Sequence, residues 1–269
     1  MESIIGNKTH YDQTRIMRRS LLVKYSIVMT SFNNEKTIEP CLTSLYNQIN
    51  ENYEIIIVDN LSSDGTTNIL DKWSKKPNIT VIYEKCSRGL GRKLGVDLAK
   101  GDYLILQLDC DEVFKPILNQ IIAVYESEYT DILLTFNKSE KIMFCISPRE
   151  LVIKIGNYRD INYHEDRDLY WRCALWNKFG HYYGSEQLVK IHERGGSLSW
   201  KILKRLFDSS IDSFRIGDLP PHLKKTKYWT PLLWLLIPFF YIYSKLMPQF
   251  ENKKGIREFK EINYKVNKE

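Results

Sequence analysis

The 269-residue chain has few cysteines, and they show no pattern typical of a disulfide framework or a zinc site. The five cysteines (41, 86, 110, 145 and 173) are odd in number, scattered, and form no CxxC pair. This predicts free thiols in a reducing compartment. The N-terminal stretch MRRSLLVKYSIVMTSFN also lacks an apolar core long enough for a secretory signal, because Lys24 interrupts it. We therefore expect the folded part of the chain to lie on the cytoplasmic side.

Long apolar runs are also scarce. The longest uncharged stretch, residues 228–244, has 17 residues and contains Pro231 and Pro238, whereas a transmembrane helix needs about 20 apolar residues. Residues 201–269 carry 14 Lys/Arg against 7 Asp/Glu, a charge of +7, whereas residues 1–200 carry 25 against 26. With no nucleic-acid-binding motif nearby, these features favour a membrane surface over nucleic acid. A single membrane anchor and a helix buried against the rest of the protein remain the alternatives.

From Tyr25 onward, apolar strand-like runs alternate with helical patterns. Strands are expected at residues 25–30, 53–60, 78–85 and 103–109, followed by two more at 130–136 and 141–146. A helix is expected over residues 88–101, with Gly101 as its stop signal. This alternation predicts an α/β fold with a mostly parallel sheet and helices on both faces. We expect a flexible arm (1–20), an α/β domain (21–200) and a basic, partly hydrophobic helical region (201–269).

The stretch YLILQLDCDEVF, residues 103–114, is an apolar strand that ends on Asp109 and Asp111. The preceding strands end on Thr30–Asn33 and on Asp59, so polar side chains are expected along one edge of the sheet, where open α/β sheets bind ligands. Carboxylates gathered there would repel one another unless a cation lay between them. A hard divalent ion that also binds diphosphate oxygens fits this arrangement. Turn or cap aspartates are the alternative.

The helix that follows the third strand contributes basic side chains to the same edge. Arg88, Arg92 and Lys93 are suited to bind phosphate oxygens or the edge of a nucleobase. In the alternative interpretation, an arginine of this helix pairs with Asp97 or Asp102 and has a structural role only.

In order and spacing, the segments SIVMTSFNNEKTIEPCLTSLYNQ, YEIIIVDNLSSDGT and RGLGRKLGVDLAKGDYLILQLDCDE resemble the nucleotide-binding half of family 2 glycosyltransferases, which have the GT-A fold. The resemblance implies that Thr30, Phe32 and Asp59 bind the base and ribose of a nucleotide-sugar. It also implies that Arg92 is the arginine of the AR-N signature, and that Asp109 and Asp111 form the DxD pair binding Mn²⁺ or Mg²⁺. The sequence departs from the family pattern at Gly91 and Lys93, where alanine and asparagine are usual, and at Phe32, which replaces a frequent tyrosine.

In the second half of the chain, HEDRDLYWR resembles the family's ED-x-DL-x-x-R motif, with Asp166 at the position of the catalytic base. Inverting transfer needs such a carboxylate to deprotonate the acceptor hydroxyl. Glu165, Asp168 and Arg172 are then assigned to the acceptor side. The alternative is that these acidic residues only favour the helix dipole. His192 matches a histidine that in several members reaches the metal or diphosphate; a structural histidine is the alternative.

Together these features predict an inverting, metal-dependent glycosyltransferase at the cytoplasmic face of a membrane. Its donor is expected to be a UDP- or GDP-sugar and its acceptor a glycan or a lipid-linked molecule. A polyprenyl-phosphate sugar synthase of the same fold and a non-catalytic nucleotide-sugar-binding relative are the alternatives.

Overall fold

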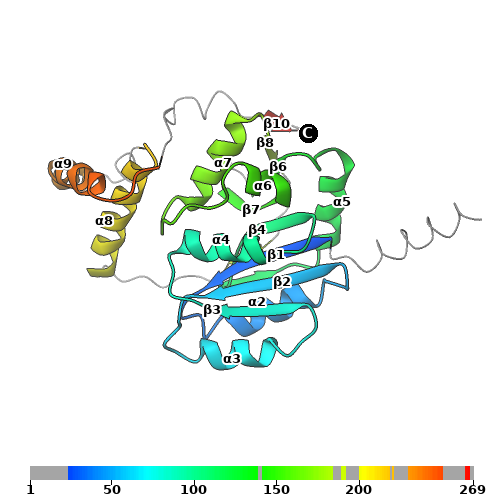
Figure 1. The fold of residues 1–269 in the computed structure, drawn as a ribbon. Helices are drawn as coiled ribbons and strands as arrows, with labels where there is room; N and C mark the ends of the chain where they lie inside the picture. The colour runs from blue at the N-terminus through cyan, green and yellow to red at the C-terminus, as the bar shows by residue number, and fades with distance from the viewer. Residues whose placement is uncertain are drawn as a thin grey trace, which may run out of the picture.

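The computed structural model describes residues 24–138, 141–183, 189–191, 200–218, 220, 230–250 and 264–266. The arm expected at residues 1–20 and the candidate ligand His192 lie outside these ranges. Within them, Figure 1 shows a central sheet with helices on both of its faces and a pair of helices, α8 and α9, at one side.

The described residues form an eight-stranded sheet in the order β10-β8-β6-β7-β4-β1-β2-β3. Most neighbouring strands are parallel, but β7 runs antiparallel to both β4 and β6. The expected α/β fold with a mostly parallel sheet is confirmed, and the arrangement is consistent with GT-A. The strands are β1 Tyr25–Ser31, β2 Tyr53–Asp59, β3 Ile79–Tyr83, β4 Tyr103–Asp109, β6 Leu133–Lys138, β7 Lys141–Pro148, β8 Phe179–Tyr183 and β10 Tyr264–Val266.

Alternating side chains of the strands divide the core into two layers. In β1, Ile27 and Met29 pack on one face of the sheet, whereas Val28 packs on the other. The first face is covered by α2 (Ile38–Tyr46), α3 (Thr66–Trp73) and α5 (Leu118–Glu128). The second is covered by α4 (Arg88–Leu98), α6 (Arg149–Lys154) and α7 (Glu165–Leu175). The sheet is therefore buried on both faces, as its apolar strands require.

Helix α4 begins where Ser87 caps it and ends earlier than expected. The Ser87 hydroxyl accepts a hydrogen bond from the Leu90 N–H at 3.1 Å, and the last helical residue is Leu98. The prediction that Gly101 stops this helix is wrong, because Gly101 lies beyond its end and packs against β1. A Cβ atom on Gly101 would lie 2.8 Å from the Ser26 backbone nitrogen, so glycine permits close approach of the chain to the sheet.

Strand β4 contains a bulge just before the aspartates. Ile27 of β1 pairs with Ile105, but Met29 pairs with Leu108, so one extra residue is accommodated in β4. Gln107 takes up the change with a φ of +72°, which is unusual for a residue other than glycine. The bulge places Ile105 and Leu108 on the same face of the sheet, although they are three residues apart. It also shifts by one residue the direction of every side chain that follows, Asp109 included.

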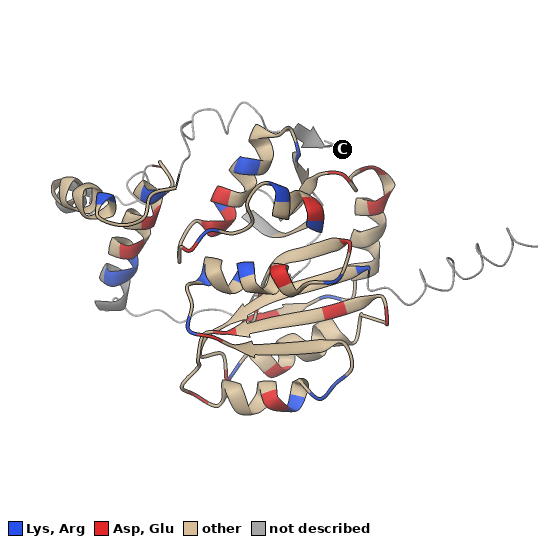
Figure 2. Cartoon of the chain, in the orientation of Figure 1, with Lys and Arg blue, Asp and Glu red and all other residues tan. Residues whose placement is uncertain are grey.

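Two smaller units flank the sheet. Strands β5 (Glu112–Phe114) and β9 (Val189–Ile191) form an antiparallel pair. Helices α8 (Trp200–Arg215) and α9 (Thr230–Lys245) pack side by side, and the rings of Phe207 and Phe240 meet edge to face at 5.1 Å. Among the described residues, no helix is long and apolar enough to cross a membrane. Figure 2 shows charged residues at several positions of α8, whereas most of α9 is uncharged.

Candidate active site

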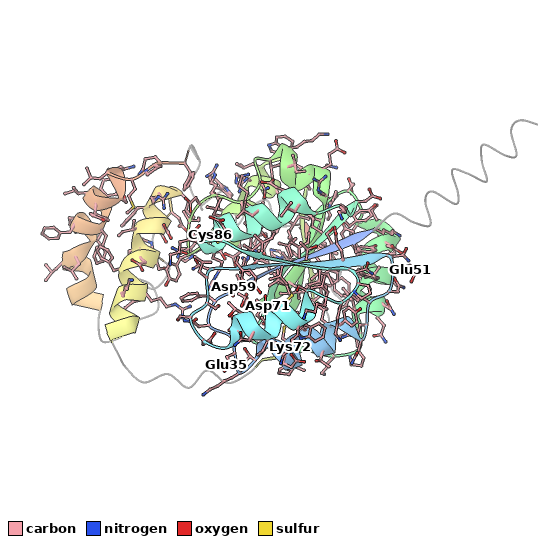
Figure 3. The ribbon with its side chains drawn as sticks, turned by 60° about the horizontal axis from the view of Figure 1, so that its bottom comes forward. Glu35, Glu51, Asp59, Asp71, Lys72 and Cys86 are labelled. Carbon is pink, nitrogen blue, oxygen red and sulfur yellow. The ribbon has the colours of Figure 1, made fainter. Side chains whose placement is uncertain are left out.

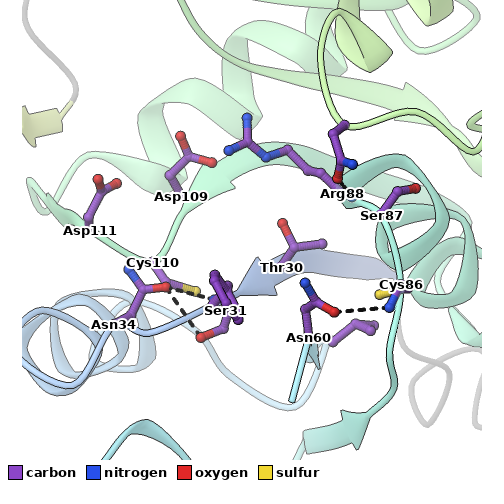
Figure 4. Close-up of a pocket in the computed structure, with 13 residues that line it drawn as sticks. Thr30, Ser31, Asn34, Asn60, Cys86, Ser87, Arg88, Asp109, Cys110 and Asp111 are labelled. Atoms are coloured by element: carbon purple, nitrogen blue, oxygen red, sulfur yellow. Dashed lines mark hydrogen bonds between the residues drawn. The ribbon is translucent and has the colours of Figure 1, made fainter. Parts of the chain in front are cut away.

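A pocket of about 300 Å³ opens at the carboxyl ends of the parallel strands. Its walls come from the segments that follow β1, β2, β3 and β4, and from the loop before α7 (Figure 4). Figure 3 shows Asp59 and Cys86 at this end of the sheet and Glu51 at the opposite end. The lining residues are Thr30, Ser31, Phe32, Asn34, Val58, Asn60, Cys86, Ser87, Arg88, Asp109, Cys110, Asp111 and Asn162. The location agrees with the expected edge of the sheet.

Both aspartates of the predicted metal-binding pair reach this pocket. The side chain of Asp109 is 42% exposed, and Figure 4 shows Asp109 and Asp111 on the same side of the pocket. Across the described residues, no group of three or more His, Cys, Asp and Glu side chains is arranged to hold a metal ion. Two carboxylates are nevertheless the oxygen donors that Mg²⁺ or Mn²⁺ prefers, since such ions complete their coordination with waters and substrate phosphates. The donor set at the pocket thus fits a divalent cation that is shared with a phosphate ligand.

The opposite wall is the N-terminal turn of α4. Its first amides are already hydrogen-bonded: the Arg88 N–H donates to Asn162 Oδ1 at 3.0 Å and the Gly89 N–H to the Ile161 carbonyl at 2.9 Å. An anion here would therefore meet the Arg88 guanidinium and the positive end of the helix dipole rather than these amides. In Figure 4 the Arg88 side chain extends toward Asp109. Arginine and carboxylate thus face one another across the pocket.

Arg92 does not line the pocket but lies buried behind it. Its guanidinium is 2.7 Å from Glu165 and 3.6 Å from Asp109, and it also donates to Gln107 Oε1 at 2.6 Å. Burial raises the pKa of Glu165 to about 7, although Arg92 acts against the shift. Burial would lower the pKa of Arg92, but the Glu165 carboxylate raises it above its ordinary value. Arg92 thus connects the bulged strand β4 to the start of α7.

The residues expected to bind the nucleoside differ in accessibility. Thr30 and Phe32 line the pocket, and Phe32 is available for stacking because more than half of the residue is exposed. Asp59, in contrast, is fully buried. Its two carboxylate oxygens accept hydrogen bonds from the backbone N–H (2.7 Å) and hydroxyl (2.6 Å) of Ser62. In this structure Asp59 holds the turn after β2 that forms one side of the pocket.

The acidic residues at the start of α7 have three different environments. Glu165 is paired with Arg92, while Asp168 is buried and accepts hydrogen bonds from Arg172 at 2.7 Å and Arg159 at 2.9 Å. Arg172 also donates to two backbone carbonyls, at Ile155 and Asn157. These contacts make Asp168 and Arg172 a buried link between α7 and the turn after α6. Asp166 is only half-buried. It is thus the most accessible of the three carboxylates.

The sequence profile described as Glycosyl transferase family 2 matches residues 26–182, which run from β1 to β8 and leave out α8, α9 and the two short strands β9 and β10. This match extends over more than half of the chain. The chain belongs to glycosyl transferase family 2. The resemblance seen in the strand-end motifs is therefore confirmed.

Curated relatives of this family match the chain over shorter stretches. A poly(ribitol-phosphate) beta-glucosyltransferase from Bacillus spizizenii is 40% identical over 96 residues, which are 34% of this chain and 15% of the relative. An abequosyltransferase, RfbV, from Salmonella typhimurium is 34% identical over 119 residues, 42% of this chain and 35% of the relative. The chain thus spans well under half the length of these relatives.

A solved structure of similar fold covers more of the chain. The mannosyltransferase PcManGT from Pyrobaculum calidifontis, in complex with GDP-Man and Mn²⁺, superposes with a TM-score of 0.58 over 88% of this chain and 80% of its own. The sequence identity is 16%, so the likeness concerns the fold alone.

Several pocket residues of this family 2 chain were not anticipated from its sequence. Asn60 Oδ1 accepts the Cys86 N–H at 3.0 Å and so joins the segments after β2 and β3. Asn60 follows β2 directly, and Cys86 and Ser87 lie within four residues of the end of β3, so the rule that located Asp109 could have found them as well. Asn162 has no such signal, because its loop reaches the pocket from 74 positions along the chain from Arg88.

Proposed function

We propose that the chain transfers a sugar from a nucleotide diphosphate donor, a UDP- or GDP-sugar, to an acceptor hydroxyl with inversion at the anomeric carbon. The observation that carries this proposal is the pocket in which Asp109 and Asp111 face Arg88, near the start of α7. It is supported by family membership and by relatives named as glycosyltransferases. Structures of similar fold hold UDP-GlcNAc (TarS from S. aureus) and GDP-Man with Mn²⁺.

The donor would be held by groups with complementary chemistry. Phe32 offers a ring face for the base, and Arg88 offers a planar guanidinium for the diphosphate oxygens. A divalent cation, Mn²⁺ or Mg²⁺, bound at Asp109 and Asp111 would supply positive charge to the leaving diphosphate. The buried Arg92 holds Asp109 from behind and keeps this carboxylate beside the pocket.

Asp166 is proposed as the general base. Inverting transfer requires a carboxylate that accepts the proton of the acceptor hydroxyl as its oxygen attacks the anomeric carbon. Glu165 and Asp168 are engaged in buried ion pairs with arginines, so their carboxylate oxygens are already occupied by contacts within the protein. Asp166 is half-buried in the first turn of α7, and its carboxylate is the most accessible of the three. These environments support Asp166 rather than its two neighbours.

We also propose that helices α8 and α9 contact the anionic surface of a membrane, on its cytoplasmic side. Leu235, Phe239, Ile242 and Leu246 recur at helical spacing and are between 61% and 80% exposed, so they form an apolar stripe. Lys245 is exposed on the same helix, and Lys204 and Arg205 are exposed on α8. An apolar stripe next to cationic side chains is the pattern of helices that lie in the interface of a bilayer. The acceptor of the transferred sugar would then be a glycan or a lipid-linked molecule at that surface.

Donor cleavage by the purified chain tests the proposed reaction. UDP-glucose, UDP-GlcNAc and GDP-mannose would each be incubated with Mn²⁺ or with a chelator, and release of UDP or GDP measured. Asp166→Asn is expected to reduce turnover by about 10²–10⁴-fold while nucleotide binding is retained. Asp131→Asn, an exposed carboxylate in the turn before β6, serves as the control. Normal turnover in Asp166→Asn together with an inactive Asp168→Asn would assign the base to Asp168 instead.

The same assay can distinguish between the possible classes of acceptor. Stimulation of donor cleavage by a polyprenyl phosphate alone would indicate a polyprenyl-phosphate sugar synthase, whereas stimulation by a glycan hydroxyl acceptor would indicate a glycan-modifying enzyme. Absence of cleavage and of nucleotide binding for every donor would contradict the proposed function.

A further inference from the structure

Helix α8 inserts a buried carboxylate against the loop that precedes α7. Asp212 is 6% exposed, and its Oδ2 atom accepts hydrogen bonds from the backbone N–H groups of Asn162 at 2.9 Å and Tyr163 at 3.1 Å. Its Oδ1 atom accepts a hydrogen bond from Arg215 Nη1 at 3.0 Å. A buried carboxylate with this many donors fixes the backbone that it binds, because releasing it would leave buried polar groups unpaired.

On one side, the fixed loop forms part of the donor pocket. Asn162 lines the pocket and caps α4 through the Arg88 N–H, and the neighbouring Ile161 carbonyl accepts the Gly89 N–H. The contact is close: a Cβ atom on Gly89 would lie 2.0 Å from the Arg159 carbonyl oxygen. A displacement of this loop would therefore move the N-terminal turn of α4 and the root of the Arg88 side chain.

On the other side, the loop leads directly into the proposed base. His164, which follows Tyr163, has a φ of +66°, and α7 begins at the next residue. A left-handed conformation is unfavourable for a residue other than glycine and persists only where the surroundings hold it. Here α8 supplies those surroundings, because Asp212 binds the preceding amide and Ser209 Oγ lies 2.8 Å from His164 Nε2. The direction in which α7 starts, and with it the position of Asp166, depends on this backbone turn.

We propose that Asp212 is a positioning residue for sugar transfer, acting through the Asn162–His164 backbone on Asp166 and on the Arg88 wall of the donor pocket. The inference rests on the proposed role of Asp166 as base. It assigns α8 a part in catalysis in addition to any contact with a membrane. A displacement of about 1 Å at a reacting group can reduce turnover on the order of 100-fold. Loss of this contact is therefore expected to lower kcat by much more than any accompanying loss of folded protein would explain.

Three variants of the full chain separate this role from general destabilisation. Asp212→Ala removes the acceptor of both amides, whereas Asp212→Asn keeps one oxygen that can accept them. Asp208→Ala is the matched control, since it removes a half-buried carboxylate one turn earlier on the same helix. Each variant would be examined by amide hydrogen exchange, by binding of UDP and GDP with Mn²⁺, and by kcat and KM for whichever nucleotide-sugar the wild-type protein cleaves.

For Asp212→Ala we expect rapid exchange at the amides of Asn162, Tyr163 and Arg88, with unchanged protection in β1 and β4. Its kcat should fall on the order of 100-fold with a smaller change in KM, and Asp212→Asn should recover most of the loss. The proposal is overturned by a kcat within about twofold of wild type in Asp212→Ala, by an equal loss in Asp208→Ala, or by loss of protection throughout the sheet. It is also overturned if Asp212→Asn keeps the amides protected but is as slow as Asp212→Ala.

The outcome for Asp212 is separable from that for the proposed function. If the wild-type chain cleaves no donor, the proposed function fails, yet hydrogen exchange still reports whether Asp212 holds the loop. If the wild type is active and Asp212→Ala is equally active, only the positioning role fails.

Discussion

The guanidinium of Arg92 and the carboxylate of Glu165 lie 2.7 Å apart, and each side chain is only 4% exposed. This ion pair spans 73 residues and ties α4, which forms one wall of the pocket, to the first turn of α7. Arg92 also approaches Asp109, so a single buried cation serves one carboxylate from each half of the site. Helix α4, the end of β4 and the start of α7 are thereby held in one arrangement.

Removal of Arg92 should be costly. Arg92→Met leaves Glu165 buried with only the guanidinium of Arg88 near it, at 3.9 Å, and breaking a buried pair typically costs about 3–5 kcal/mol in the free energy of unfolding. We expect about 3 kcal/mol, because the raised pKa of Glu165 lets this carboxyl take up a proton instead. Lys93→Met is the matched control: it removes an exposed helical pair with Asp97 and should cost roughly 0.5 kcal/mol. Equal denaturation midpoints for the two variants would contradict the prediction.

Glu165 should make stability depend on pH in a defined direction. Burial raises its pKa from 4.5 to about 7, so the folded protein binds this proton more tightly than the unfolded chain. Its contribution is fully present below pH 4.5 and is lost as the pH rises through 7. Glu165→Gln should flatten the fall of the unfolding free energy between these values, measured by urea denaturation. Glu150→Gln, at an exposed carboxylate, should leave that slope as it is in the wild type.

Asp111 should be needed for metal-dependent binding of the donor. Asp111→Asn removes one negative charge and one carboxylate ligand from the pocket. This weakens the binding of a hard divalent cation more than it affects the surrounding fold. We expect Mn²⁺ to enhance UDP or GDP binding in the wild type and to have little effect in the variant, as measured by calorimetry. The exposed Asp131→Asn serves as a control for the substitution itself. An Asp111→Asn protein that is folded and binds the nucleotide in Mn²⁺ as tightly as the wild type would exclude this role.

The stripe on α9 should govern contact with lipid. Replacing Phe239 and Ile242 by serine is expected to reduce sedimentation with anionic liposomes, because both side chains are exposed and apolar. High salt should weaken wild-type binding without abolishing it, since screening affects only the attraction of the basic residues. Ile153→Ser, an exposed apolar residue on α6, should have no effect. Absence of wild-type binding to anionic liposomes would contradict the proposed membrane contact.

The main features of the α/β domain were predictable because they follow from patterns of residues close together in the sequence. Apolar runs such as Leu104–Leu106 indicate strands that are buried on both faces, and the structure confirms them as fully buried. The position of Asp109 and Asp111 at a pocket also follows from local information, since parallel strands end at the same edge of a sheet. These inferences need only the period of the apolar residues and the direction of the strands.

Other features of the site depend on contacts between distant parts of the chain. The amino-acid sequence around Gln107 shows nothing that predicts a bulge, which becomes visible only when β4 is paired with β1. Likewise, the stretch HEDRDLYWR does not show that arginines from two directions bury Asp168 whereas Asp166 stays accessible.

By itself, the sequence determined the family, the succession of the first four strands along the chain and the aspartates at a strand end. Each of these can be recognised from residues that are close together in the chain. Only the tertiary structure decided which charged residues meet. Arg92 pairs with Glu165, 73 positions away in the sequence, and Asp212 accepts a hydrogen bond from the Asn162 amide, 50 positions away. Such pairs are chosen by the packing of helices on the sheet, which brings a particular donor and acceptor into the same buried volume where neither can be left unpaired.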